Sequence, residues 1–438
     1  MFRSERVSRR GFVKRAAAVV AAPCVVPASA LGRGDSVAPS NRIALGFIGT
    51  GSHGVNRNIK RFLPEPDAWA VAVCDVDFDL REAAKERVEK HYSDATAKGS
   101  YKGCAAYNDF REIINRKDID AVVISTPDHW HVIPAVMAAR AGKDVMCEKP
   151  LSLTVVEGRI LSDTVKRYSR IFQTASENRS YECYYRMAEL VRNGRIGALR
   201  HVRVTLPRGH SIQQASMEFG PPPKGFDYDM WLGQAPWAPY CPARCHWNFR
   251  WILDYSGGQL TDWGAHLIDI AQWGNNTEDS GPVEVEGKGE FPKEGLYNTA
   301  TDFNIGYKYA NGVTMNVSSS RPGIRFEGTE GWVGNKAWNA PIDAEPQYIL
   351  DSKIGADEIH LYKEPRGEQR NFLDCVKSRK PCYAPAETGH RTITIAHIGN
   401  ISMMLGRRLK WNPETECFVN DAEADKMLSR PMREPWTL

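Results

Sequence analysis

The sequence lacks an excess of charge of either sign, and it lacks a run of basic residues. It contains 57 Lys and Arg against 53 Asp and Glu, which gives a formal net charge of +4 over 438 residues. Proteins that bind nucleic acid or anionic membranes by electrostatics gather Lys and Arg on one face or in one segment. The even mixture of charges argues against that class of partner. We therefore expect a small-molecule partner and no nucleic acid.

Cysteine is present but shows no organised spacing. Ten cysteines are scattered through the chain without the regular intervals of a disulfide framework. Cys241-x-x-x-Cys245-His246 is the one tight cluster, and a structural zinc site would need a second pair of ligands. We interpret this cluster as a loop thiol pair, with a metal half-site as the alternative, and we predict no bound metal.

The apolar run of the N-terminal segment, residues 16–26, is too short to span a bilayer as a stable anchor. It follows Arg9-Arg10 and precedes Ala28-Ser29-Ala30, a pattern typical of a twin-arginine signal peptide. We expect the twin-arginine translocase to export the folded chain to the periplasm, with residues 1–30 removed and residues 31–41 forming a linker. The alternatives are a basic amphipathic helix on a cytosolic protein and a lipoprotein.

The chain has no internal repeat and no low-complexity segment, and a strand-helix alternation begins at residue 42. Four short runs, rich in β-branched residues and without polar alternation, predict strands buried on both faces at 43–48, 69–74, 121–125 and 144–147. Helical patterns separate them at 55–63, 80–91, 110–116 and 131–141. These observations predict an α/β fold whose residues 42–175 form a doubly wound parallel sheet of the Rossmann type.

The pattern changes after Pro150, and residues 176–438 are predicted to form a second domain. Runs of alternating polarity occur at 201–206, 283–287, 303–309 and 313–318, with a hairpin turn at Asn311-Gly312. They predict an α/β domain with a mostly antiparallel open sheet that binds substrate and forms a dimer or tetramer. Residues 207–258 form a long segment that is rich in aromatic residues and is called the excursion below. Long segments without regular structure of their own are usually functional.

A glycine-rich turn follows the first predicted strand and opens a helix. It reads Gly49-Thr50-Gly51-Ser52-His53-Gly54. In a dinucleotide-binding turn the first glycine permits the tight turn, the second lets the backbone approach the pyrophosphate, and the third lets helix and strand pack closely. The helix N-terminus adds unpaired N–H groups. The placement predicts a bound NAD or NADP.

Three further strand ends carry polar residues to the same edge of the sheet. Asp75 ends the second strand, where a carboxylate binds the ribose 2′-hydroxyl and repels a 2′-phosphate, which favours NAD. The ends of the next two strands are expected to line the nicotinamide site, with the residues Ser125, Thr126, Pro127, His131, Glu148 and Lys149. As alternatives to these binding roles, His131 equally fits a residue at the start of a helix, and Asp75 could be the N-cap of a helix.

These motifs together resemble the Gfo/Idh/MocA family, which includes glucose-fructose oxidoreductase and inositol dehydrogenase. The resemblance rests on the glycine turn, Thr126-Pro127-x-x-x-His131 and above all Cys147-Glu148-Lys149-Pro150. Residues 193–197 and 328–331 resemble short motifs of that family's second domain, so the resemblance continues beyond the first domain. The resemblance implies that Lys149 lies beside the reacting carbon and the nicotinamide. Asp128 is a departure, because relatives often carry Asn there.

Asp262 and His266 form a second candidate constellation. A spacing of four places both on one face of a helix, and the residues alone favour a capping Asp and a core His. The resemblance implies that His266 is the acid/base, since oxidising an alcohol requires that the hydroxyl proton leave and imidazole titrates near neutral pH. A metal site on this pair would need a third ligand, and none is evident.

The expected substrate contacts are Arg179, Trp231, Trp247 and Arg250, since aromatic side chains stack on the apolar faces of sugars. The resemblance implies an NAD(P)-dependent oxidoreductase that acts on a CH–OH group of a sugar, polyol or glycoside. Because free NAD is not expected outside the cytoplasm, the cofactor should stay tightly bound. Two alternatives remain. One is an NAD-dependent glycosidase, in which oxidation of the sugar is followed by elimination of the leaving group, addition of water and reduction. The other is a non-enzymatic sugar-binding protein.

Overall fold

The computed structural model describes residues 37–211 and 216–438. The predicted signal peptide and most of the predicted linker therefore lie outside the described residues. The chain divides into two compact units, Met1–Arg42 and Ile43–Leu438. In the described part of the first unit, η2 (Pro39–Asn41) is a single 3-10 turn. The fold and the site described below belong to the second unit.

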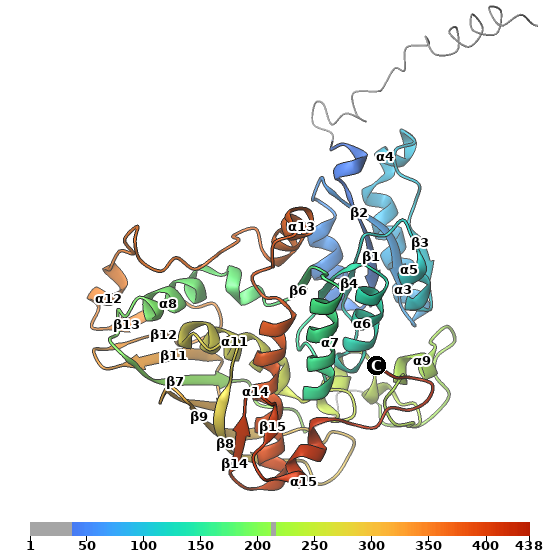
Figure 1. Ribbon diagram of the computed structural model, residues 1–438. Helices are drawn as coiled ribbons and strands as arrows, with labels where there is room; N and C mark the ends of the chain where they lie inside the picture. Colours follow the sequence, from blue (N-terminus) through green and yellow to red (C-terminus); the bar gives the residue numbers. More distant parts are fainter. Residues whose placement is uncertain (1–36, 212–215) are drawn as a thin grey trace, which may run out of the picture. The chain divides into compact units, whose positions relative to one another are not determined.

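The first sheet of the second unit has six parallel strands in the order β3-β2-β1-β4-β5-β6 (Figure 1). Their bounds are β1 (Ile43–Ile48), β2 (Ala68–Cys74), β3 (Ala105–Tyr107), β4 (Ala121–Ile124), β5 (Asp144–Cys147) and β6 (Phe172–Thr174). The strand order reverses between β1 and β4, which is the switch point of a doubly wound sheet. The predicted Rossmann fold is confirmed.

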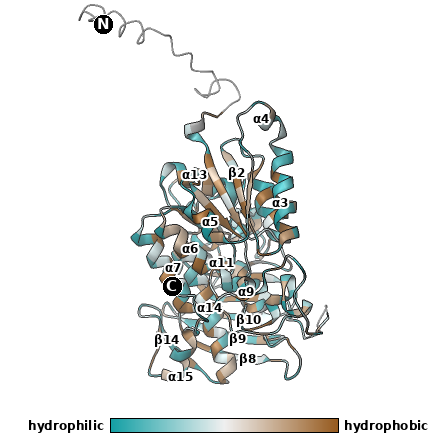
Figure 2. Cartoon of the chain, turned by 90° about the vertical axis from the view of Figure 1, so that its right-hand side faces the viewer, coloured by the Kyte–Doolittle hydropathy of each residue, from teal (hydrophilic) through white to brown (hydrophobic). Residues whose placement is uncertain are grey.

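Helices cover both faces of this sheet because alternate strand residues feed two separate cores. Leu45 and Phe47 of β1 belong to the core that includes Val88, whereas Ile48 belongs to the core that includes Ile113 and Val136. The helical segments of this part are η3 (Gly54–Ile59), α2 (Lys60–Phe62), α3 (Phe78–His91), α4 (Ser93–Ala97), α5 (Phe110–Asn115), η4 (Asp128–Trp130), α6 (Val132–Arg140) and α7 (Val155–Arg167). Figure 2 shows the hydrophobic strand β2 beside the mostly hydrophilic α3.

The second sheet has nine strands in the order β13-β12-β11-β7-β10-β9-β8-β14-β15. Only β7 and β10 pair in parallel, so the predicted mostly antiparallel sheet is confirmed. The strands are β7 (Leu199–Leu206), β8 (Pro282–Glu290), β9 (Asp302–Tyr309), β10 (Thr314–Ser319), β11 (Gly323–Gly328), β12 (Trp332–Asn335), β13 (Asp343–Glu345), β14 (Leu409–Asn412) and β15 (Cys417–Phe418).

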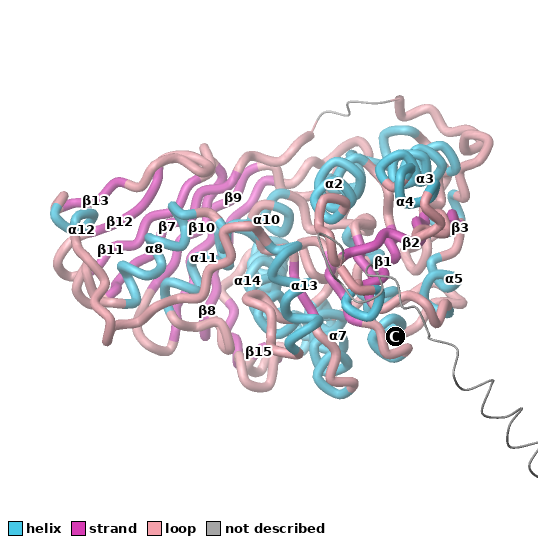
Figure 3. Tube along the Cα trace, turned by 90° about the horizontal axis from the view of Figure 1, so that it is seen from above, coloured by secondary structure: helices cyan, strands magenta, loops and turns pink. Residues whose placement is uncertain are grey.

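Helices cover one face of the second sheet. Figure 3 shows α8, α11 and α14 beside its strands. Alternate residues of β9 are buried and exposed, as in a sheet with one covered face. The helical segments are η5 (Glu177–Ser180), α8 (Glu182–Arg192), α9 (Tyr228–Leu232), η6 (Pro242–Arg244), η7 (His246–Trp251), α10 (Gln259–Asp262), α11 (Gly264–Asn275), α12 (Tyr348–Asp351), α13 (Glu368–Ser378), α14 (Ala386–Leu405), α15 (Ala422–Asp425) and η8 (Lys426–Leu428). No helix in the described part of the chain is long and apolar enough to cross a bilayer.

Two segments of the C-terminal part return to the first sheet. In α13, Phe372 packs edge-on against Phe62 with 6.5 Å between ring centroids. The excursion carries α9, η6 and η7, and its own aromatic core includes Trp231 and Tyr255. Its backbone is tied to the end of β2, because Phe78 N–H donates to Gly225 O and Asp227 N–H donates to Val76 O, both at 2.9 Å. The excursion therefore lies against the first sheet.

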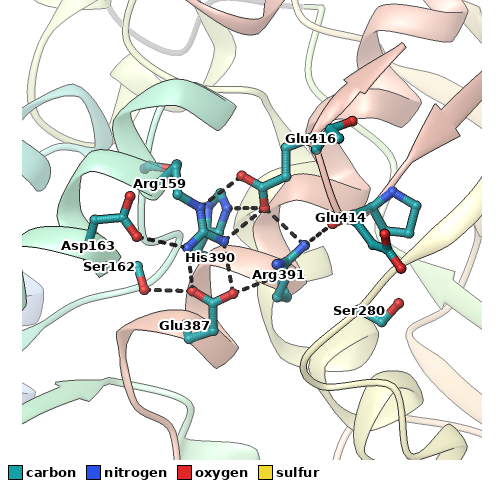
Figure 4. Close-up of polar contacts among 12 residues, drawn as sticks. Arg159, Ser162, Asp163, Ser280, Glu387, His390, Arg391, Glu414 and Glu416 are labelled. Atoms are coloured by element: carbon teal, nitrogen blue, oxygen red, sulfur yellow. Dashed lines mark hydrogen bonds and ion pairs between the residues drawn. The ribbon is translucent and has the colours of Figure 1, made fainter. Parts of the chain in front are cut away.

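A charged cluster joins α7, α14 and the β14–β15 turn (Figure 4). Arg159 pairs with Glu387 at 2.8 Å and with Glu416 at 2.9 Å. Arg391 pairs with both carboxylates, at 2.7 and 3.0 Å, and His390 Nε2 lies 2.7 Å from Glu416 Oε1. Burial acts to raise the pKa of Glu416, but its bonds to His390 and Arg159 lower it to about 2. The cluster fastens a helix of the first sheet to the second sheet.

Glu416→Gln should lower the free energy of unfolding at neutral pH by about 2 kcal/mol, because it removes a carboxylate that pairs with two arginines in a partly buried cluster. A lowered carboxyl pKa stabilises the fold above the unfolded-state pKa, so the difference from wild type should shrink as pH falls from about 5 towards about 2. Urea denaturation at several pH values measures this. Glu414→Gln, an equal charge change on an exposed residue of the same turn, is the control and should change little.

Candidate active site

A cavity of about 700 Å³ opens at the switch point of the first sheet. This volume is typical of ligand and cofactor sites. Its walls come from the segments that follow β1, β2, β4 and β5 and from the excursion. Of the predicted site residues, it is lined by Gly49, Gly51, Ser52, His53, Asp75, Ser125, Thr126, Pro127, Glu148, Lys149, Trp231, Trp247 and Arg250. Residues from separate parts of the sequence thus meet at one cavity.

The three glycines of the turn after β1 have different surroundings. A Cβ at Gly49, where φ is +87°, would lie 2.6 Å from the Ser125 carbonyl carbon, and a Cβ at Gly54 would lie 2.2 Å from Gly49 O. A Cβ at Gly51 would meet no atom within 4 Å. The fold itself therefore requires the first and third glycines, whereas Gly51 faces open space in the cavity, as a cradle for a ligand's phosphates would.

Asp75 fastens this turn to β2. Its Oδ2 accepts from Thr50 N–H at 2.6 Å and from the Thr50 hydroxyl at 3.2 Å, and its Oδ1 accepts from Asp77 N–H at 3.0 Å. Burial raises the pKa of this carboxyl above its ordinary value. Thr50 is buried and points at Asp75 rather than lining the cavity. A carboxylate can accept about four hydrogen bonds, so Asp75 retains capacity for a ligand hydroxyl.

Two cationic side chains line the cavity beside the glycine turn. His53 Nε2 lies 2.9 Å from Glu148 Oε1, and this carboxylate raises the pKa of His53. Arg57 pairs with Glu368 of α13 at 2.6 Å and with Glu177. Burial acts to lower the pKa of Arg57, but the two carboxylates outweigh this effect and raise the pKa above its ordinary value. Sequence reasoning missed Arg57, although its place in the first turn after the glycines was a signal for an anion-binding role.

Lys149 is held by a carboxylate from the second sheet's helices. Its Nζ donates to Asp262 Oδ1 at 2.6 Å and to Asp262 O at 3.3 Å. Arg250 Nε lies 3.5 Å from Asp262 Oδ2. Burial acts to raise the pKa of Asp262, but the two cations lower it to about 2. The ammonium has three donors, so one remains for an oxygen in the cavity that Lys149 lines.

His266 differs from a base that titrates near neutral pH. Its side chain is buried and packs against Trp338 with 5.0 Å between ring centroids. Burial and the nearby Lys149 hold its pKa well below 6.5. Its Nδ1 has no hydrogen-bond partner among the described residues. The helix also breaks at Trp263 between α10 and α11, and neither Asp262 nor His266 is among the described residues that line this cavity.

Asp128, the departure from the family pattern, lines the cavity in the turn after β4. Its side chain is buried, and its Oδ2 accepts from Ser256 Oγ at 2.6 Å. Burial raises its pKa to about 7, while Arg250 acts to lower it and Asp262 to raise it. This carboxyl is therefore the one beside Lys149 that changes charge near neutral pH.

Two of the predicted site residues hold the structure together instead. His131 is buried, and its ring nitrogens face Pro150 O at 2.6 Å and Thr126 O at 2.9 Å. It joins the two loops and marks the start of α6, which agrees with the helix-start interpretation. Arg179 was predicted to reach the pocket, and it is not among the described residues that line this cavity. It is buried against Asp269, with two bonds of 2.7 Å, and also bonds Glu278 at 2.7 Å.

The remaining substrate candidates differ in exposure. Trp231 is 4% exposed and stacks on Tyr228, so much of it is core. Trp247 is 59% exposed, and the Arg250 guanidinium lies 4.2 Å from its ring centroid. Cys241 and Cys245 are both buried, and no group of three His, Cys, Asp or Glu within residues 37–211 and 216–438 is placed to hold a metal.

Comparison with known proteins places this geometry in a family. Residues 43–176 match the NAD-binding Rossmann fold of the Gfo/Idh/MocA oxidoreductase family, and residues 189–438 match its C-terminal alpha/beta domain. Glycosyl hydrolase family 109 protein 1 of Shewanella sp. (strain ANA-3) is 32% identical over 213 residues, which is 44% of this chain and 45% of that protein. The chain thus matches less than half the length of this curated relative.

Two solved structures share the fold at low sequence identity. The aldose-aldose oxidoreductase from Caulobacter crescentus, complexed with glycerol, aligns with a TM-score of 0.63 and 18% identity over 84% of this chain and 99% of that one. Levoglucosan dehydrogenase, in complex with NADH and L-sorbose, aligns with a TM-score of 0.60 and 19% identity over 84% and 99%. The two family matches span most of the described residues, and the chain belongs to the Gfo/Idh/MocA family of NAD-binding oxidoreductases.

Proposed function

We propose that the protein oxidises or reduces a CH–OH group of a sugar, polyol or glycoside with a tightly bound NAD. One observation carries this proposal: the glycine turn of the first sheet and the Lys149 ammonium, held by Asp262 from the second sheet's helices, face one cavity. The names of the two structural neighbours, an aldose-aldose oxidoreductase and a levoglucosan dehydrogenase in complex with NADH and L-sorbose, support the substrate class.

The residues around the cavity fit a dinucleotide. The space at Gly51 suits a phosphate against the backbone, and the charges of His53 and Arg57 suit a pyrophosphate. Asp75 would bind a ribose hydroxyl and repel a 2′-phosphate, which favours NAD over NADP. Ser125, Thr126, Pro127 and Lys149 would surround the nicotinamide end. The bound cofactor would supply the redox chemistry.

The chain's own residues supply positioning and charge. The free donor of Lys149 would hold the oxygen of the reacting carbon and stabilise negative charge on it. Asp262 keeps the ammonium in place, and Arg250 shares that carboxylate. The excursion covers the other end of the cavity, since Phe226 and Trp247 line it together with Asp75.

Tight retention of the cofactor follows from this cover and from the proposed export. The backbone bonds of Phe78 and Asp227 hold the excursion over the end of β2, next to Asp75. Release of the adenosine end would require these bonds to open. A chain that the twin-arginine translocase carries folded to the periplasm would take its nucleotide with it and regenerate it with a second substrate. The open face of the second sheet would serve a homodimer or tetramer.

A second candidate function comes from the family 109 glycosyl hydrolase relative. In an NAD-dependent glycosidase, transient oxidation acidifies a neighbouring C–H, elimination expels the leaving group, and water adds before reduction. The same cavity and the same Lys149 would serve that chemistry. A non-enzymatic sugar-binding protein is the third candidate, and the intact glycine turn together with the Lys149–Asp262 pair weighs against it.

Nucleotide analysis of the purified protein tests the proposal. We expect NAD(H) to survive extended dialysis and to appear on denaturation, and we expect cofactor fluorescence to change with at least one member of a panel of sugars and polyols. Aryl glycosides added to the panel separate the second function, because release of the aryl alcohol without net NADH would select a glycosidase. If neither nucleotide nor a sugar-dependent signal is found, the enzymatic proposal fails.

Two glycine substitutions should separate binding from folding. Gly51→Ala should leave the melting temperature near that of wild type, because its Cβ meets no protein atom within 4 Å, yet it should lower nucleotide content at least tenfold by blocking the phosphates. Gly54→Ala should lower the melting temperature, because its Cβ would lie 2.2 Å from Gly49 O. Thermal melts and nucleotide content per chain are the measurements. Full nucleotide content in Gly51→Ala would contradict the placement of the phosphates.

Lys149→Ala should lower kcat by about 10³-fold, within the range for losing a positioned acid/base or polarising group, while nucleotide content stays unchanged. Lys117→Ala, which removes an exposed lysine of the same sheet's connections, is the control and should keep full turnover. His266→Ala tests the acid/base role that the family resemblance assigns to His266, and loss of turnover with nucleotide retained would support that role. Unchanged turnover in His266→Ala would remove that residue from the mechanism.

A further inference from the structure

The roles proposed for the glycine turn and for Lys149 do not account for the position of Asp128. It begins η4 directly after β4 and lines the same cavity as Lys149. Asp128 is 4% exposed, and the one hydrogen-bond donor to its side chain among the described residues is the Ser256 hydroxyl at 2.6 Å. A buried carboxylate is normally paired with a cation or with several donors. No cation of the described chain lies within ion-pair distance of Asp128.

The charged and titratable groups around Asp128 come from every element that packs near it. Arg250 of η7 and Lys149 after β5 favour its charged form, whereas Asp262 of α10 opposes it. Both cations are already directed at Asp262, the ammonium at 2.6 Å and the guanidinium at 3.5 Å. Burial prevails over them and raises the pKa of Asp128 to about 7. Its other titratable neighbours are the Cys147 thiol, His129 and His131.

The other groups near Lys149 are unsuited to taking a proton at neutral pH. The pKa of Asp262 is about 2, and burial and Lys149 hold that of His266 far below 6.5, so both are weak bases. The pKa of Glu148 is lowered by His53 despite its burial. His53 itself has a raised pKa, but it lies in the glycine turn and is paired with Glu148. Asp75 and His246 also line the cavity, but Asp75 is bonded to the glycine turn and His246 lies 3.9 Å from Asp77 after β2. Asp128 is therefore the remaining acceptor near Lys149 among the described residues that line the cavity.

We propose that Asp128 accepts the substrate's hydroxyl proton while Lys149 holds the oxygen of the same hydroxyl. This inference rests on the proposed function. In the oxidation the O–H bond breaks and its proton moves to the Asp128 carboxylate. The C–H hydrogen would leave with its electron pair to the hydride acceptor that a bound NAD supplies, and a C=O bond would form. The carbinol would lose two electrons to the cofactor, and Asp128 would end as the neutral acid. The Ser256 hydroxyl positions the carboxylate and stabilises its ionised form.

Asp128→Asn tests this inference in the full-length holoenzyme, because the amide keeps the shape and cannot take the proton. With a sugar found active in the panel, wild-type kcat/KM for oxidation should rise with pH through about 7, where Asp128 ionises. Asp128→Asn should lose this rise and at about pH 8 should be slower by about 10²-fold or more. Ser256→Ala, which removes the one hydroxyl donor, should move the rise to higher pH. A merely structural Asp128 would leave the pH profile unchanged in both variants.

A second readout does not depend on turnover. A raised carboxyl pKa destabilises the folded state as pH rises from the unfolded-state pKa to the folded one. The melting temperature of Asp128→Asn relative to wild type should therefore increase between about pH 4 and about pH 7 and stay level above that. Asp79→Asn, at an exposed carboxylate, should show no such trend.

The possible outcomes separate this inference from the function on which it rests. A wild-type protein without nucleotide or sugar-dependent turnover overturns both. An active wild type whose pH profile survives in Asp128→Asn overturns the role of Asp128 alone. If Asp128→Asn fails to fold, an unshifted profile in Ser256→Ala overturns that role equally. Loss of the rise in the first variant, its shift in the second and a pH-dependent melting difference support it.

Discussion

Lys149 stands at the end of β5, and its ammonium reaches the Asp262 carboxylate of α10 at 2.6 Å. Both side chains are nearly enclosed, at 13% and 8% exposure. Removal of Asp262 would leave the Lys149 ammonium as an unpaired buried charge, which is strongly unfavourable. The pair therefore fixes the distance between the first sheet and the helices of the second. It also positions the ammonium at the cavity, which Lys149 lines.

The parts of the fold that the sequence predicted are those determined by local pattern. β1 and β5 were located to the residue, because buried parallel strands are continuous apolar runs and Gly49 and Gly142-Lys143 mark their borders. β3 and β11 to β15 were not predicted, because most of them are only two to four residues long and give too short a pattern to detect. The packing of α13 on the first sheet was missed because its partner is distant in the sequence. Phe372 contacts Phe62, which lies more than three hundred residues away in the sequence. The hydrophobic periodicity of a helix does not identify the element against which it packs.

The sequence predicted many of the residues that line the cavity, but it predicted their protonation less well. Residue types and strand ends were enough to assemble the glycine turn, Asp75 and Lys149. The burial of Arg179 was not predicted, because its partners Asp269 and Glu278 lie about ninety or more residues away. The protonation of His266 could not be read from its type, because its low pKa comes from burial and from Lys149. Asp128 shows the converse, since an ordinary aspartate acquires a pKa near 7 only in its packed environment.

These two opposite shifts share one physical cause, and the excursion supplies much of it. Ser256 and Arg250 both belong to the segment that leaves the second sheet and returns over the first. With that segment in place, Asp128 lies in a low-dielectric environment whose nearest cations are committed to Asp262. Without it, the carboxyl would face water and would titrate near its ordinary value of about 4. The enclosure that would retain a dinucleotide is thus also what gives the site a group able to exchange a proton at neutral pH. Cofactor retention and proton transfer would then be two consequences of the same packed segment.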